Sequence, residues 1–245
     1  MDPEKQRPGT FVCFEGGDAA GKTTLASSVI DDLRRRGLSP VLVDKKSVEG
    51  FEPYLTDRLR DLRKVLWDYP RDAPLWEWGD PHWFHLIVSW FSVLDRCKIQ
   101  PLLREGRLVI ADSWYYKLAA RFLLKPEFDQ DFIFKSFAHL TKPDLVVLVD
   151  VDPQVAVTRR ETFSATESGR MDGLAKGDAE DFVRYQERVL GQLRRLCNEA
   201  WVRIDATHAS LEELVTEASD AIASVVDRSI LVLAQEERAD HDGHQ

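Results

Sequence analysis

The sequence predicts an α/β protein in which a five-stranded parallel sheet carries helices on both faces. Five short apolar segments, rich in strand-forming residues, alternate along the chain with segments of helical spacing. That alternation is typical of a parallel sheet whose connecting helices pack on its faces. The chain has 245 residues, which suits one domain of this class, and it contains no internal repeat.

The five expected strands are the segments 10–15, 40–44, 107–112, 145–150 and 201–205. The first reads Thr-Phe-Val-Cys-Phe-Glu and ends in glycines, and the fourth, Leu-Val-Val-Leu-Val-Asp, is the most strongly apolar. Short runs of this composition, bounded by turn-forming residues, indicate buried strands.

The expected helices are the segments 21–36, 51–67, 80–103, 114–124, 127–140, 152–161, 178–198 and 210–237. Leucines recur at three and four residues in the second of them, and Asp80-Pro81 forms a good start for the third. Residues 162–177 hold Ser, Thr and Gly with few apolar side chains, so we expect a mobile lid there. Residues 238–245 are polar and expected to be a disordered tail. The chain is thus expected to be one domain, 1–245, with its core at about 10–237.

Composition limits the partners and the compartment. A formal net charge of −9 and a pI near 5.2 argue against nucleic acid or an anionic membrane as a partner. The cysteines, Cys13, Cys97 and Cys197, lie far apart and form no CxxC pair, which favours a reduced, cytoplasmic protein. Residues 1–9 lack the apolar stretch of a signal peptide, and no run approaches the roughly 18 apolar residues of a membrane helix.

The glycine-rich segment after the first strand matches the phosphate-loop pattern G-x-x-x-x-G-K-[ST] and opens a helix. Such a turn directs backbone N–H groups at phosphate oxygens, so the pattern predicts a P-loop NTPase fold that binds ATP. Lys22 would reach the β- and γ-phosphates, and the Thr23 hydroxyl would ligate Mg²⁺. The ATP-binding residues expected from this segment are Gly16, Gly17, Asp18, Ala19, Ala20, Gly21, Lys22, Thr23 and Thr24.

Two aspartates lie where they can serve the same site. Asp112 ends the third strand, and ligands bind beyond the carboxyl ends of strands in open α/β sheets, so it is expected to serve the Mg²⁺ site together with Thr23. Its alternative role is a helix N-cap. Asp18 projects from the phosphate loop, where it would contact Mg²⁺ or an acceptor hydroxyl, or else only structure the loop.

Three arginines flank or occupy the expected lid. Phosphoryl transfer needs cations on the oxygens of the moving group once water is excluded, and lid arginines meet that need. Arg159 and Arg170 are therefore candidates for catalysis beside Lys22 and Asp18, with Arg160 a weaker one. The alternative is that they are solvated surface charges.

Three segments resemble the thymidylate kinase family and keep its order. They are the phosphate loop with its preceding Glu15, Pro143–Arg160, and Ile204–Leu214. The resemblance implies the nucleoside monophosphate kinase fold with ATP as phosphoryl donor, Arg159 on the adenine side, and an adenine-contacting loop that includes Ala206 and Thr207. It also implies that a lid arginine assists transfer and that homodimers form through long helices, to which Trp83 and Trp90 could contribute.

The acceptor side departs from the family pattern. The family has Asp-Arg-Tyr or Asp-Arg-Phe after the third strand, where this chain has Asp112-Ser113-Trp114. A serine cannot replace the arginine that holds the acceptor's phosphate. The acceptor-binding residues expected from the resemblance are Asp18, Arg96, Asp112, Ser113 and Arg121. The aromatic segment 68–83 lies where the acceptor lid would be, and either packs or contributes to binding.

Three functions follow in order of preference. The first is an ATP- and Mg²⁺-dependent phosphotransferase that converts dTMP to dTDP. The second is a related kinase that phosphorylates a different small-molecule acceptor, which the serine at 113 favours. The third, a P-loop regulatory ATPase, is the weakest, because no Asn-Lys-x-Asp guanine motif appears.

Overall fold

The computed structural model describes residues 9–70, 73–174 and 176–242, with side chains described as far as Asp227. Its sheet has five strands in the order β2-β3-β1-β4-β5, and every pairing is parallel. The strands are β1 (Thr10–Gly16), β2 (Val41–Val43), β3 (Leu108–Ala111), β4 (Leu145–Asp150) and β5 (Trp201–Asp205). The predicted fold class, an α/β P-loop fold with a five-stranded parallel sheet, is confirmed.

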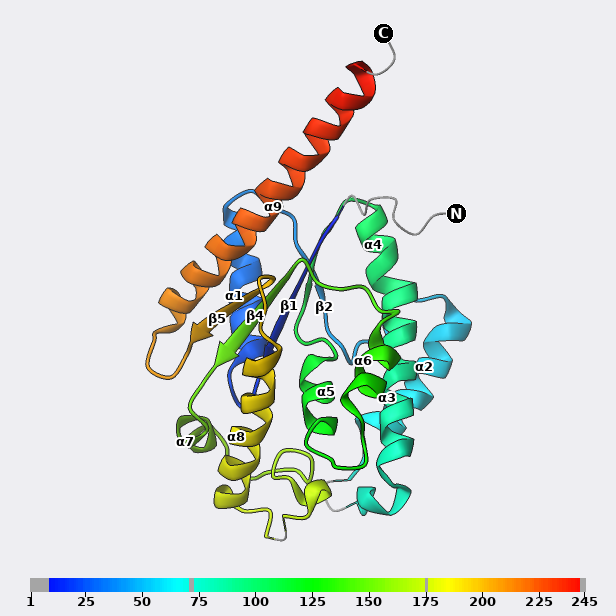
Figure 1. Ribbon diagram of the computed structural model, residues 1–245, viewed down its shortest axis with the longest axis vertical. Helices are drawn as coiled ribbons and strands as arrows, with labels where there is room; N and C mark the ends of the chain where they lie inside the picture. The colour runs from blue at the N-terminus through cyan, green and yellow to red at the C-terminus, as the bar shows by residue number, and fades with distance from the viewer. Residues whose placement is uncertain (1–8, 71–72, 175, 243–245) are drawn as a thin grey trace.

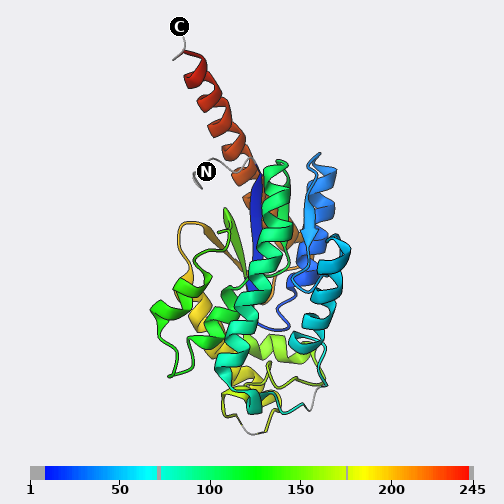
Figure 2. The ribbon, with the colours of Figure 1, turned by 90° about the vertical axis from the view of Figure 1, so that its right-hand side faces the viewer.

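Helices cover both faces of the sheet (Figures 1 and 2). They are α1 (Lys22–Arg35), α2 (Pro53–Leu66), α3 (Asp80–Leu94), α4 (Gln100–Arg104), α5 (Tyr116–Phe122), α6 (Gln130–Phe137), α7 (Pro153–Ala156), α8 (Ala179–Leu196) and α9 (Leu211–Asp242). Short 3-10 turns lie at Leu75–Trp78, Val157–Arg159 and Arg170–Asp172, and a π-helical turn at Asp95–Ile99 joins α3 to α4.

The alternation of side chains along β1 assigns the helices to their faces. Val12 and Phe14 belong to a core cluster with the apolar stripes of α1 and α9. Phe11 and Cys13 belong to the opposite cluster, with apolar residues of α2, α3, α5 and α6. All four side chains are fully buried, as expected for the central strand of a parallel sheet covered on both faces.

The sheet order places the functional loops at one edge. In the sheet, β3 and then β2 lie on one side of β1, and β4 and then β5 lie on the other, so the strand order reverses at β1. Ligands of open α/β sheets bind outside the carboxyl ends of the strands at this point. The loop after Gly16, the end of β1, and Asp112, just beyond β3, therefore meet there.

Several element boundaries differ from the sequence prediction. The expected helix 80–103 contains the π-helical turn, and the expected helix 152–161 is an α-helical turn followed by a 3-10 turn. Helix α9 runs to Asp242 and extends beyond the body (Figure 2), so residues 238–242 are helical where a disordered tail was expected. Residues 243–245 lie outside the described residues.

The two tryptophans expected at a dimer contact are core residues instead. Trp83 is 7% exposed and Trp90 is 1% exposed. The indole N–H of Trp83 donates to the Leu75 carbonyl and that of Trp90 to the Lys45 carbonyl, both at 2.7 Å. Both side chains are therefore used within the chain, and a homodimer through the helix that contains them stays a prediction.

Candidate active site

The phosphate loop turns tightly between β1 and α1. Gly16 lies so close to β4 that a Cβ there would come within 2.4 Å of the Val149 carbonyl oxygen. Gly21, just before α1, has a φ of 87°, and Ala19 has a φ of 58°. Ala19 is the one non-glycine residue with positive φ in the described part of the chain, and such backbone strain concentrates at functional loops. Lys22 folds back over the loop, donating to the carbonyls of Gly16 at 3.1 Å and Gly17 at 2.5 Å.

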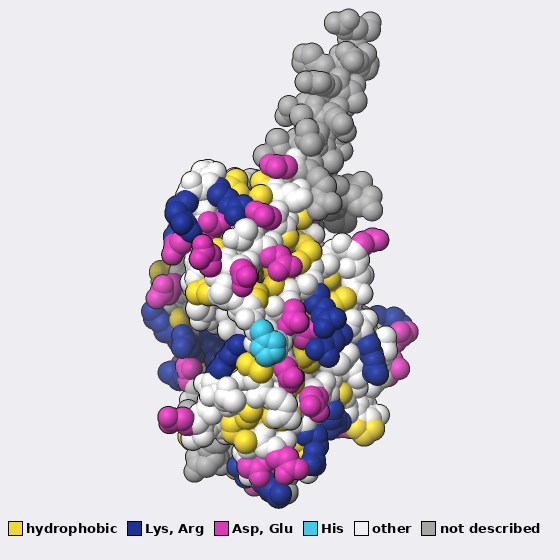
Figure 3. Space-filling model, turned by 90° about the vertical axis from the view of Figure 1, so that its left-hand side faces the viewer, with side chains coloured by type: hydrophobic (Ala, Val, Ile, Leu, Met, Phe, Trp, Pro, Cys, Tyr) yellow, Lys and Arg dark blue, Asp and Glu magenta, His cyan; other side chains and the backbone are white. Residues whose placement is uncertain are grey.

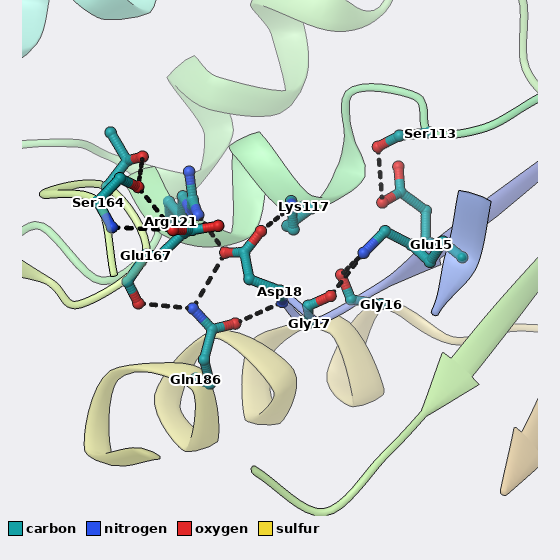
Figure 4. Close-up of polar contacts among 12 residues, drawn as sticks. Glu15, Gly16, Gly17, Asp18, Ser113, Lys117, Arg121, Ser164, Glu167 and Gln186 are labelled. Atoms are coloured by element: carbon teal, nitrogen blue, oxygen red, sulfur yellow. Dashed lines mark hydrogen bonds and ion pairs between the residues drawn. The ribbon is translucent and has the colours of Figure 1, made fainter. Parts of the chain in front are cut away.

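Asp18 is held by side chains from two helices (Figure 4). Its carboxylate accepts from Lys117 Nζ at 2.7 Å and from Arg121 Nη2 at 2.6 Å, both on α5. Gln186 on α8 contacts it twice: Nε2 donates to Asp18 Oδ2 at 3.0 Å, and Oε1 accepts from the Asp18 backbone N–H at 2.8 Å. The carboxylate is thus fixed by three donors within the protein.

Charges in this cluster perturb one another. Burial alone would raise the pKa of Asp18, but Lys117, Arg121 and Lys22 outweigh it and hold that pKa well below its ordinary value. Burial, followed by the charge of Lys117, lowers the pKa of Lys22 to about 7. The same two causes lower the pKa of Lys45, in the loop after β2, to about 8. Asp18 is therefore ionised at neutral pH. The pKa values of Lys22 and Lys45 stay low because the negative charges around these lysines do not offset their burial.

Thr23 and Asp112 form the pair expected at a Mg²⁺ site. The Thr23 hydroxyl donates to Asp112 Oδ2 at 2.8 Å. Asp112 Oδ1 is buried and has no hydrogen-bond partner among the described residues. Hydroxyl and carboxylate oxygens are hard ligands, and protein-bound Mg²⁺ often takes only one or two of them beside substrate phosphates. The described residues hold no group of three or more His, Cys, Asp or Glu side chains that could hold a metal ion.

Ser113 does not reach the cavity. It is 1% exposed, and its hydroxyl donates to Glu15 Oε2 at 3.4 Å. Glu15 is fully buried in β1 and also accepts from the Trp114 backbone N–H at 2.9 Å. Burial raises the pKa of Glu15, although Lys45, Lys117 and Lys22 oppose that shift. Ser113 thus supports the buried carboxylate behind the phosphate loop.

Arg159 links the phosphate loop to the loop after β5. Its guanidinium donates to the Ala19 carbonyl at 3.1 Å and to the Ala206 carbonyl at 3.5 Å. The Thr207 hydroxyl accepts from the Asp152 backbone N–H at 3.2 Å, which fixes the neighbouring turn. The three residues expected near adenine therefore lie together at this edge, and Arg159 lines the cavity described below.

The other candidate arginines differ in position. Arg160 lines the cavity and pairs with Glu167 at 3.5 Å. Arg170 lies 5.6 Å from the centroid of the Trp76 ring and does not line the cavity. Arg96 is exposed on the π-helical turn and is also not among the lining residues. Of the expected arginines, the structure therefore brings Arg121, Arg159 and Arg160 to the cavity.

One cavity of about 990 Å³ joins these groups. The consecutive residues Asp18–Thr24 line it, with Lys45, Lys46 and Asp112. Aromatic and aliphatic side chains line it too: Leu66, Trp67, Tyr69, Leu75, Trp83, Ile87, Leu118 and Phe122. Part of the aromatic segment 68–83 therefore faces the cavity, whereas Trp76 and Trp78 are exposed, at 46% and 59%. Polar groups that suit phosphates thus adjoin an apolar surface that suits a base.

The described part of the segment 162–177 contributes five residues to the cavity lining: Ser164, Thr166, Glu167, Met171 and Asp172. Lys125, at the end of the α5 region, pairs with Asp80 of α3 at 2.8 Å and with Asp172 at 3.1 Å. It also donates to the Met171 carbonyl at 3.1 Å. Asp80, Lys125, Met171 and Asp172 all line the cavity. The expected lid segment is therefore tied across the cavity to the start of α3 by one buried lysine.

Sequence reasoning missed two residues of this site, Lys117 and Gln186. Lys117 lies four residues before Arg121, on the same face of a helix, so helical spacing could have paired the two. Nothing in the sequence distinguishes Gln186 from any other polar residue of α8.

Acidic side chains are spread over the face drawn in Figure 3 with basic ones among them, in keeping with the net charge of −9. In the described part of the chain, no helix combines the length and the apolar character needed to cross a membrane.

Known proteins with similar sequences are thymidylate kinases, in keeping with the fold and the phosphate loop. No protein-family model matches the chain. The probable thymidylate kinase of Staphylothermus marinus is 32% identical over 155 residues, which cover 62% of this chain and 69% of that protein. The thymidylate kinase of Dinoroseobacter shibae is 30% identical over 74% of this chain and 76% of its own length. That of Danio rerio is 23% identical over 94% and 95% of the two chains. The chain therefore belongs to the thymidylate kinase family and is a kinase built on a P-loop fold.

Proposed function

We propose that the chain transfers the terminal phosphoryl group of ATP, with Mg²⁺, to a nucleoside monophosphate, with dTMP the first candidate. The observation that carries the proposal is the single cavity that holds the phosphate loop, the Thr23–Asp112 pair and an aromatic wall. Donor and acceptor must lie in one enclosure for direct transfer. The thymidylate kinase relatives support the choice of acceptor.

The chain's own groups would act mainly by position and charge. Lys22, when its amine leaves the loop carbonyls, lies at the point where the phosphate loop presents its N–H groups to the β- and γ-phosphates. Arg159 would frame the adenine side between Ala19 and Ala206. Bound Mg²⁺, held through Thr23 and Asp112, would neutralise charge on the phosphates.

Water must be kept from the transferring group, or ATP would be hydrolysed instead. Residues 162–177 would serve as the lid, because Lys125 ties Asp172 to Asp80 across the cavity. Arg160 is the lid-side arginine that the proposal favours over Arg170, since it lines the cavity while Arg170 lies over Trp76. Release of its pair with Glu167 would free it for phosphate oxygens.

ATP-dependent ADP release tests the proposal. The chain would be assayed with and without Mg²⁺ against nucleoside monophosphates, the matching nucleosides and small hydroxyl acceptors, with the phosphorylated product identified by mass. We expect turnover that requires Mg²⁺ and is highest with dTMP. ADP release at the same rate with no acceptor present would support the regulatory ATPase instead.

A second acceptor class is favoured by one observation. Ser113, where the family has the arginine that holds the acceptor's phosphate, is buried against Glu15 and does not line the cavity. A kinase for a different small molecule would then use the same donor site. Turnover of another acceptor in the panel, with dTMP inert, would support this second candidate.

A further inference from the structure

The cations of α5 lie where the family's missing arginine would be needed. Lys117 and Arg121 are four residues apart, so they project from the same side of the helix. Their side chains are 7% and 14% exposed, and both end at the carboxylate of Asp18. Both line the cavity that Ser113 does not reach. Lys117 and Arg121 therefore form a largely buried cationic pair beside the phosphate loop.

The charge around this pair is unbalanced toward the positive. Eight lysines and arginines line the cavity, and six aspartates and glutamates line it as well. Of the acids, Asp18 and Asp172 act on Arg121. The amine of Lys45 forms no hydrogen bond or ion pair with any of the described residues. The Arg121 Nε is buried and likewise has no hydrogen-bond partner among them. A buried donor without an acceptor is costly, so a bound anion that accepts from Arg121 would be stabilised here.

We propose that Lys117 and Arg121, with Lys45 from the loop after β2, bind the phosphate of the acceptor, so that the acceptor of this kinase is a phosphate-bearing nucleotide rather than a free nucleoside. This rests on the function proposed above. Asp18 is the residue that orients the pair, since each cation gives it one contact and keeps further donors: Lys has three N–H groups and Arg five. A phosphate brings more acceptor oxygens and more charge than a carboxylate, which suits an arginine fork beside two ammonium groups.

The space next to the pair fits the rest of such a ligand. Leu118 and Phe122 follow Lys117 and Arg121 along α5 and line the same cavity as Trp67 and Trp83. A base can therefore pack on apolar side chains while its phosphate meets the cations one helical turn away.

Kinetics of Lys117→Met, with dTMP and with thymidine as acceptors, test the inference. We expect the KM for dTMP to rise about 10- to 100-fold, the cost of losing a charge-assisted contact, while the KM for ATP changes less than about threefold. Thymidine, which has no phosphate, should be a poor acceptor for both proteins. The matched control is Lys135→Met, which removes the same charge from α6, where the Lys135 side chain is 78% exposed. It should leave both constants unchanged.

Other variants keep the test decisive. Arg121→Gln, at the more exposed member of the pair, replaces Lys117→Met if that protein unfolds, and Arg121→Lys should restore part of the dTMP affinity. An unchanged KM for dTMP, or equal turnover of thymidine and dTMP, would overturn the inference while leaving the kinase intact. If no acceptor is phosphorylated, the proposed function fails, and calorimetric titration of dTMP decides the inference alone. Weaker binding of dTMP to Lys117→Met supports the inference. Equal binding to both proteins, or no binding to either, overturns it.

Discussion

The side-chain amide of Gln186 holds both the backbone and the carboxylate of Asp18. Its Oε1 accepts from the Asp18 N–H at 2.8 Å, and its Nε2 donates to Asp18 Oδ2 at 3.0 Å. The same Nε2 donates to the carbonyl of Glu167 at 2.8 Å. Gln186 is 1% exposed, so these contacts are shielded from water. One amide on α8 therefore joins the phosphate loop to Glu167, a residue of the expected lid that lines the cavity (Figure 4).

Replacing Gln186 by Leu should slow phosphoryl transfer without abolishing nucleotide binding. Asp18 would lose two of its contacts, and Glu167 would lose the donor that links it to the loop. We expect kcat to fall about tenfold, the worth of one or two buried hydrogen bonds, with the Kd for ATP within about threefold. Steady-state kinetics and a nucleotide titration measure the two quantities separately.

Two further variants show whether position or mere packing is involved. Gln186→Glu keeps the size but sets a second carboxylate against Asp18, so it should lower kcat more than Leu does. Gln192→Leu makes the same change elsewhere on α8 and should have no effect on kcat. A drop in melting temperature with kcat unchanged would show that Gln186 only stabilises the fold.

Lys22→Ala should abolish phosphoryl transfer and leave the fold intact. The amine lies over the phosphate loop, where it would meet the transferred group, and loss of such a cation costs about 100-fold or more in kcat. Burial already lowers its pKa to about 7, so removing the amine relieves an unfavourable buried charge rather than a strong structural contact. Product formation measures the loss of phosphoryl transfer, and circular dichroism shows whether the fold is intact. Turnover near the parent rate would contradict the catalytic role of Lys22.

The fold could be predicted because its signals are local. Strands β1 and β4 are continuous apolar runs, and their predicted boundaries agree with the structure to within one residue. The π-helical turn Asp95–Ile99 could not be predicted, because helical spacing continues through it. In this turn Asp95 is buried, and Gln100 Nε2, five residues further on, donates to it at 2.7 Å.

The site was predictable only where one segment carries it. The residues 16–24 form a recognisable loop because their spacing alone creates the phosphate cradle. Lys117 and Gln186 reach Asp18 across 99 and 168 positions of sequence, so no local pattern predicts their contact with the phosphate loop. Their roles depend on how α5 and α8 pack against the loop, which one sequence without its fold does not disclose.

Asp112→Asn should weaken the dependence on Mg²⁺ rather than the binding of nucleotide itself. The buried Oδ1 of Asp112, which has no partner among the described residues, lies beside the Thr23 hydroxyl. An amide keeps the shape but loses the charge, so the Mg²⁺ concentration for half-maximal rate should rise about tenfold. Asp131→Asn, at an exposed position of α6, is the matched control and should leave that concentration unchanged. An equal Mg²⁺ requirement in both variants would remove Asp112 from the metal site.

Binding of ATP should take up protons from solution at pH 8. The pKa of Lys22 is lowered to about 7 and that of Lys45 to about 8, so both amines are partly neutral at this pH. A bound phosphate favours the protonated amine and raises each pKa toward the ordinary value of about 10.4. Since the phosphates of free ATP are already ionised at pH 8, the net exchange should be an uptake of about one proton. Calorimetry in two buffers of different ionisation enthalpy measures it.

The sign of the effect fixes the rest of the pH profile. Because the complex holds more protons than its separated parts, affinity for ATP should decrease as pH rises from about 7 to about 10. Lys45→Met removes one of the two titrating amines, so its uptake at pH 8 should fall by about half a proton. Equal heats in both buffers would mean that the lysines are already fully protonated in the free protein. The excess of positive charge beside the phosphate loop would then be balanced by groups other than the bound phosphate.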